Sequence, residues 1–144
     1  MMPPVQNAGL PANAKPRGVD PGWGFTSRHT FSPAIVCDGW LFVSGLVASG
    51  PGRTILCKGD IVGQTSVIYE RLGEILRAAS CDFQDVVVTR EFIVSTEDYR
   101  KTADVRRRVF KDPYPAATGV IVAGLLQPDA LIEIEAIARV PDVT

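Results

Sequence analysis

Two carboxylates near the C-terminal end of the chain have the spacing of side chains that share one face of a strand. Glu133 and Glu135 alternate with apolar residues in the segment 131–140, and successive side chains of a strand point to opposite faces. Ile132 and Ile134 would then pack against helices, while the glutamates face something other than the core. Carboxylates can serve as general acids or bases, although Glu135 is more simply explained as half of a structural ion pair.

A second pair of charges lies inside another predicted strand, in the segment 85–94. Arg90 and Glu91 are adjacent, so their side chains must point to opposite faces of the sheet. Whichever of them faces the core needs a partner, because an unpaired buried charge is costly. Arg90 could clamp an anionic ligand or form a salt bridge between subunits, and the salt bridge is the simpler interpretation.

Other groups that could carry chemistry are few. His29 is the only histidine, and the three cysteines form no CxxC motif, which argues against a zinc site or a disulfide framework. No Gly-x-Ser-x-Gly motif supports a serine nucleophile. The basic run 106–108 is interpreted as a solvated helix end. A net charge of −1 is also unlike that of a typical nucleic-acid-binding protein.

The chain has 144 residues, which is enough for one domain with a substantial core. Residues 1–26 hold five of the eleven prolines, so we expect a flexible or extended tail there and a single domain over 27–144. Trp23 and Phe25 could pin the tail to the body. No apolar run approaches the roughly 18 residues of a membrane span, and no signal-peptide pattern is present. We therefore expect a cytoplasmic protein that binds neither membranes nor nucleic acid.

The body shows the strand and helix patterns of an α+β fold. Asp38-Gly39 favours a hairpin, Asp60 is a suitable N-cap for the first helix, and residues 95–96 could cap the second. The predicted elements are strands at 33–37, 40–45, 53–57, 85–94, 117–123 and 131–140, and helices at 61–79 and 97–110. If both helices cover one face of the sheet, the other face is left bare with apolar side chains such as Phe42. Such a face favours an oligomer.

Several segments resemble the RidA/YjgF/YER057c family. They are FSPAIVCDGWLFVSG at 31–45, GDIVGQT at 59–65, DVVVTREFIV at 85–94 and PAATGVIVAGLLQPDALIEIEAIARV at 115–140. The resemblance implies a chorismate-mutase-like α+β fold, in which two helices cover one face of a mixed six-stranded sheet. It also implies a homotrimer around a central barrel, with small-molecule substrates bound in clefts between subunits. Members of this family hydrolyse reactive imines and enamines to keto acids and ammonia, and they use no metal or cofactor.

The resemblance assigns site residues position by position. The glutamate of the I-E-I-E strand is retained as Glu133, which the resemblance makes the catalytic group that orients water or takes its proton. The Ser-Gly pair at the end of the second strand is retained as Ser44-Gly45. Backbone N–H groups near Ser44 and Thr118 could bind a substrate oxygen.

Three polar positions of the family differ in this chain. Phe31 stands where the family has a tyrosine, Ala103 where it has an asparagine, and Ala117 where it has the arginine that binds the substrate carboxylate. Losing a charge-assisted bond of this kind costs about 1.5–3 kcal/mol. We therefore expect a hydrolase for a larger, more apolar or differently charged imine, with Arg90 as a candidate replacement clamp. The alternatives are a non-catalytic small-molecule-binding protein, a specialised biosynthetic or catabolic enzyme of another reaction type and, last, a ribonuclease.

Overall fold

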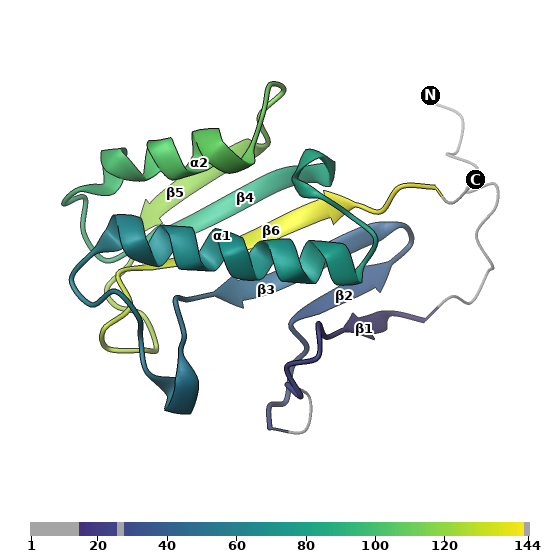
Figure 1. Ribbon diagram of the computed structural model, residues 1–144, viewed down its shortest axis with the longest axis horizontal. Helices are drawn as coiled ribbons and strands as arrows, with labels where there is room; N and C mark the ends of the chain where they lie inside the picture. The colour runs from purple at the N-terminus through teal and green to yellow at the C-terminus, as the bar shows by residue number, and fades with distance from the viewer. Residues whose placement is uncertain (1–14, 26–27, 143–144) are drawn as a thin grey trace, which may run out of the picture.

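The computed structural model describes residues 15–25 and 28–142, which form one mixed sheet with two α-helices on one of its faces (Figure 1). The strands are β1 (Arg17–Val19), β2 (Ala34–Cys37), β3 (Trp40–Leu46), β4 (Val86–Ile93), β5 (Ala116–Ile121) and β6 (Ile132–Arg139). The helices are α1 (Ile61–Ala78) and α2 (Ala103–Val109), with short 3-10 helices η1 (Pro51–Arg53), η2 (Phe83–Asp85) and η3 (Tyr99–Thr102). The strand order is β1-β2-β3-β6-β4-β5, and only β4 and β5 are parallel neighbours. The predicted α+β fold with a mixed six-stranded sheet is confirmed.

The sixth strand differs from the one that the sequence predicts. The segment 53–57 is not a strand and contributes only an isolated bridge between Ser49 and Ile55. Arg53 and Cys57 have φ angles of 61° and 53°, and backbone in this left-handed region cannot continue an extended strand. The prediction of a strand there is therefore wrong.

The sixth strand is β1, which lies inside the segment predicted to be a tail. Arg17 pairs with Val36 and Val19 pairs with Ala34. The prolines of this segment do not prevent the pairing, because Pro16 and Pro21 flank the strand and remove no donor from it. Residues 1–14 and 26–27 lie outside the described residues, so the tail itself stays a prediction.

The first helix agrees with the prediction and the second is shorter. The Asp60 carboxylate caps α1 by accepting from the Gly63 N–H at 3.0 Å. The helix expected over 97–110 instead starts as η3 and becomes α-helical at Ala103. Asp98 has a φ of 57°, which interrupts helical geometry, and Ser95 closes a turn by accepting from the Glu97 N–H rather than capping a helix.

The core fills the space between the sheet and the helices. The predicted apolar stripe of α1 is buried throughout, and β6 alternates as expected, with Ile132, Ile134, Ala136 and Ala138 buried. Tyr69 and Phe110 meet edge to face in this layer, with ring centroids 5.4 Å apart. Because α1 and β6 are fixed by this packing, the opposite side chains of β6 are held in one orientation on the bare face.

The bare face and the β5 edge expose apolar side chains. All six residues of β5 are exposed, and Phe42, Val120 and Ile121 are exposed by 46%, 42% and 62%. An exposed apolar edge strand is usually covered by another chain. In the described part of the chain, no helix combines the length and the apolar character that crossing a membrane would require.

Candidate active site

Glu133 lies on the bare face, with its carboxylate packed directly over the backbone of Gly45. The register between β3 and β6 shifts between Val43 and Leu46, so the strand is irregular at the Ser44-Gly45 pair. A Cβ at Gly45 would come within 2.9 Å of Cδ of Glu133. A side chain at this position would displace the Glu133 carboxylate, so glycine allows the carboxylate to approach the backbone this closely.

The surroundings of Glu133 disfavour its charged form. Partial burial raises the pKa of Glu133, and the neighbouring charge of Glu135 raises it further. Among the described residues, no donor forms a hydrogen bond with the Glu133 carboxylate. A carboxylate with a raised pKa and unused acceptor sites is suited to take a proton from water.

Arg90 lies next to this carboxylate pair and is already engaged. Its Nη1 is 3.2 Å from Oε1 of Glu135, and both side chains are partly exposed. The prediction that Glu135 forms a structural ion pair is confirmed, and the partner is in the same chain. Arg90 is paired with Thr118 across β4 and β5, so Thr118 also lies on the Glu133 face.

Ser44 holds the segment that precedes β2 in the sequence. Its hydroxyl donates to the Ser32 carbonyl at 2.7 Å, and its N–H donates to the Pro33 carbonyl at 3.0 Å. The Ser44 N–H is therefore engaged within the chain, and binding of a substrate oxygen by backbone N–H groups near Ser44 stays a prediction. These bonds hold Phe31, the residue before Ser32, beside the strand that carries Gly45.

Phe31 belongs to a cluster of three aromatic rings. Its ring centroid is 5.1 Å from that of Phe25 and 5.3 Å from that of His29, while Phe25 and His29 are 4.1 Å apart. Phe31 is 53% exposed. We call Phe25, His29 and Phe31 the ring cluster. From the sequence, Phe31 is expected in the site and His29 either near the mouth of the cleft or in an exposed tail, whereas Phe25 is not expected there.

Ala117 and Ala103 lie on the other side of the sheet from Glu133. Ala117 is paired with Thr89, which is fully buried beneath the helices, and Ala103 begins α2 in the helical layer. The fold of one chain therefore separates the predicted site residues into two groups. Glu133, Gly45 and Phe31 form one group, and Ala103 and Ala117 belong to the other.

Beside Ala117, the helical side holds a buried polar network that sequence analysis missed. Glu91 accepts from Tyr99 Oη at 2.5 Å, from Arg106 Nη1 at 3.0 Å and from Tyr69 Oη at 3.2 Å. Arg106 Nη1 also donates to Thr89 Oγ1 at 3.1 Å. Burial, followed by the Glu91 charge, raises the pKa of Tyr69, and burial raises the pKa of Tyr99 to about 12.

The basic run 106–108 is not a uniformly solvated helix end. Arg106 is only 16% exposed because it pairs with Glu91, whose side chain is 3% exposed. Arg107 pairs with Asp104 on the surface. The signal that sequence analysis had was the Arg90-Glu91 dipeptide, which predicted one buried charge but could not identify its partner.

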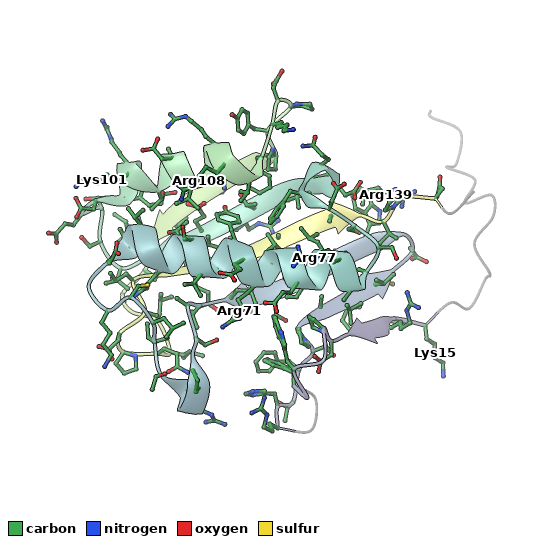
Figure 2. The ribbon with its side chains drawn as sticks, viewed as in Figure 1. Lys15, Arg71, Arg77, Lys101, Arg108 and Arg139 are labelled. Atoms are coloured by element: carbon green, nitrogen blue, oxygen red, sulfur yellow. The ribbon has the colours of Figure 1, made fainter. Side chains whose placement is uncertain are left out.

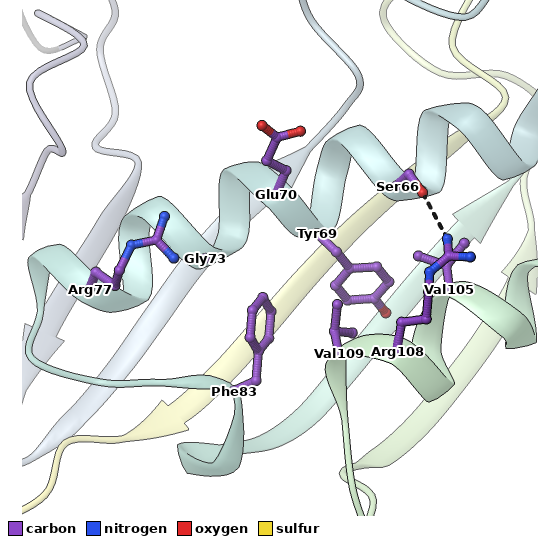
Figure 3. A pocket seen from close by; sticks show the side chains of 9 residues that line it. All are labelled: Ser66, Tyr69, Glu70, Gly73, Arg77, Phe83, Val105, Arg108 and Val109. Carbon is purple, nitrogen blue, oxygen red and sulfur yellow. Dashed lines mark hydrogen bonds between the residues drawn. The ribbon is translucent and has the colours of Figure 1, made fainter.

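A shallow pocket of about 210 Å³ lies between α1 and α2, away from the Glu133 face (Figure 3). Tyr69, Phe83 and Val105 are among its lining residues. Arg108 donates to Ser66 Oγ at 3.3 Å across it. Figure 2 shows Arg71 and Arg77 along α1 and Arg108 on α2, on the outer surface of the helical layer.

Comparisons with known proteins cover most of the chain. The family model described as Endoribonuclease L-PSP matches residues 24–140. Human 2-iminobutanoate/2-iminopropanoate deaminase is 32% identical over 108 residues, which cover 75% of this chain and 78% of that protein. A RutC family protein of Pyrococcus horikoshii is 35% identical over 108 residues, covering 75% and 85%.

Solved structures similar to this chain include members of the Rid and YjgF/YER057c/UK114 families. A member of the YjgF/YER057c/UK114 family from Mycobacterium tuberculosis has a TM-score of 0.73 at 29% identity, covering 88% of this chain and 100% of that chain. A protein of the conserved Rid family from Yersinia pestis has a TM-score of 0.71 at 31% identity, covering 77% and 88%.

Proposed function

The chain belongs to the RidA/YjgF family, and from this premise we propose that it hydrolyses a reactive imine or enamine to a carbonyl compound and ammonia. Relatives that are about a third identical are named imine deaminases. The observation that carries the proposal is the Glu133 carboxylate, which lies over Gly45 with a raised pKa and with acceptor sites left unused.

The reaction consumes one water molecule, and both of its O–H protons must be removed. Glu133 accepts the first proton as the water oxygen attacks the carbon of a protonated imine, which gives a neutral carbinolamine. The carboxyl group then returns that proton to the nitrogen, and the regenerated carboxylate accepts the hydroxyl proton as the C=O bond forms and ammonia leaves. An enamine enters the same path once its carbon is protonated. A carboxyl group whose pKa is raised by burial can serve in both directions.

We further propose that the complete site is built by two chains of a homotrimer. Within one chain, Glu133 and Ala117 lie on opposite sides of the sheet, so a cleft containing both groups needs a second copy. The exposed apolar edge of β5 supports this arrangement. The substrate would then be a small molecule held between subunits.

Cleavage of RNA has less support from the charges. The description of the matching family names an endoribonuclease, but two of the three arginines at 106–108 are neutralised by Glu91 and Asp104. Phosphate recognition depends on free cationic groups, and the described surface gathers few of them at this point.

Ammonia release is the direct test. Imines are generated in solution by an L-amino-acid oxidase, and release above the spontaneous rate is measured for wild type and Glu133→Gln. Removal of a general base should reduce kcat by about 100-fold or more. Glu97→Gln, an exposed loop change, serves as the matched control and should retain full activity. Equal rates with and without the protein on a broad imine panel would contradict the proposal.

A second variant tests whether the site has been retargeted. Ala117→Arg introduces a guanidinium that can hold a carboxylate by two charge-assisted bonds. We expect it to favour imines of small keto acids over those that the wild type prefers. Activity that appears only in Ala117→Arg would mean that the catalytic groups are intact and that the natural ligand is not the imine of a small keto acid.

A further inference from the structure

The ring cluster is tied firmly to the sheet. The Asp20 carboxylate accepts from the N–H groups of Trp23 and Phe25, both at 2.7 Å, and also from Gly22 at 3.1 Å. Trp23 packs against the core, and its carbonyl accepts from Arg28 Nη2 at 3.0 Å. Phe25 is therefore presented by a fixed turn, and its ring is free to form a defined surface with its two neighbours.

A short series of contacts links Phe31 of the ring cluster to the Glu133 carboxylate. Phe31 precedes Ser32, whose carbonyl accepts the hydroxyl of Ser44, and Gly45 under the Glu133 carboxylate follows Ser44. These steps place the Cα atoms of Phe31 and Gly45 within about 13 Å of each other. Phe31, which is half exposed, thus lies within reach of a substrate whose reacting carbon is at Glu133.

The polar groups near this corner include two arginines. Arg90 is paired with Glu135, and Arg28 donates one hydrogen bond to the Trp23 carbonyl. Glu133 and Glu135 would repel an anionic group placed between them. The ring cluster offers apolar contact to the group attached to the imine carbon.

We propose that the ring cluster binds the substituent of the imine, so that the protein prefers imines carrying an aromatic or bulky apolar group over those carrying a methyl or ethyl group. This inference rests on the proposed function and adds the substrate class to it. Phe25, His29 and Phe31 are then specificity residues, whereas Glu133 performs the proton transfers.

The test compares imines made from phenylalanine and from alanine in the ammonia-release assay. A difference of several methylene groups should give at least about a tenfold ratio of kcat/KM in favour of the phenylalanine imine. Phe31→Ala should lower that ratio several-fold. Because Phe31 is half exposed, Phe31→Ala is expected to fold, and Phe31→Leu, which keeps apolar bulk, should retain part of the preference.

Trp40→Ala is the matched control for loss of an exposed ring. Trp40 starts β3, five residues before Gly45 and therefore about 17 Å along the strand, and its ring is covered by Arg139 instead of facing the site. Its removal should leave the ratio unchanged. Equal rates on the two imines in wild type, or equal effects of Phe31→Ala and Trp40→Ala, would overturn the inference.

A binding measurement separates this inference from the proposed function. His29 is the only histidine, so histidine-selective NMR gives one imidazole signal that reports directly on the ring cluster. Phenylpyruvate, the product of the aromatic imine, should shift this signal, while pyruvate at the same concentration should not. If no imine is hydrolysed, the proposed function fails, and the His29 signal still decides the inference: a shift with phenylpyruvate alone supports it and no shift overturns it.

Discussion

Gly45 is the position at which a single added carbon should disturb the site most. A Cβ there would lie 2.9 Å from Cδ of Glu133, whereas carbon atoms in contact are about 3.5–4.0 Å apart. In Gly45→Ala the carboxylate must therefore move by roughly 0.6–1 Å. A misplacement of about 1 Å can reduce turnover on the order of 100-fold, which corresponds to about 2.7 kcal/mol of activation free energy.

The assay is kcat for ammonia release in wild type, Gly45→Ala and Gly124→Ala. Gly124 is a matched control because a Cβ there meets no atom within 4 Å. In a Glu133→Asp background the shorter side chain leaves more room, so adding Gly45→Ala should cost much less than it does in wild type, a coupling that a double-mutant cycle measures. An unchanged kcat in Gly45→Ala, with circular dichroism and melting temperature preserved, would refute the idea that Glu133 acts from its place over Gly45.

Three further predictions follow from other contacts. Because burial and the Glu135 charge raise the pKa of Glu133, the acid limb of the kcat/KM profile should lie at a higher pH than an ordinary glutamate would give. Glu135→Gln removes the like charge, so it should lower that pKa and move the acid limb of the pH–rate profile to lower pH. Glu91→Gln leaves Arg106 without its charge partner and should lower the free energy of unfolding, measured in urea, by about 3–5 kcal/mol. Asp104→Asn, which breaks an exposed ion pair, should have little effect. Equal effects of the two variants would contradict the stabilising role of the Glu91–Arg106 pair. Ile121→Lys places a charge on the exposed edge of β5 and should reduce the mass measured by sedimentation from trimer to monomer, and a wild-type monomer would contradict the two-chain site.

Local patterns in the sequence were sufficient to predict the elements whose burial is regular. Ile132, Ile134 and Ala136 alternate with polar residues because β6 has one face in the core and one outside it, and Asp60 caps α1 through an ordinary side-chain contact. These features depend on residues that are near each other in the chain. The family resemblance added the sheet as a whole.

The missed features depend on contacts between distant segments. Arg17–Val19 form a strand because they pair with the edge strand β2. A segment of three residues is too short to carry a sequence pattern that predicts this pairing. Arg106 looks like part of a charged run, yet it is buried because Glu91 lies opposite it across the core. The site residues were assigned position by position from separate motifs, and only the pairing of the strands places Ala117 and Glu133 on opposite sides of the sheet.

The network around Glu91 restricts how this chain can change over evolutionary time. One carboxylate joins α1 through Tyr69, η3 through Tyr99 and α2 through Arg106, with Thr89 of β4 completing the set. Replacing Glu91 alone leaves Arg106 without its carboxylate partner, which is far more destabilising than exchanging the whole set for apolar residues. Descendants of this sequence should therefore keep these residues together or lose them together, so the five positions behave as one inherited unit.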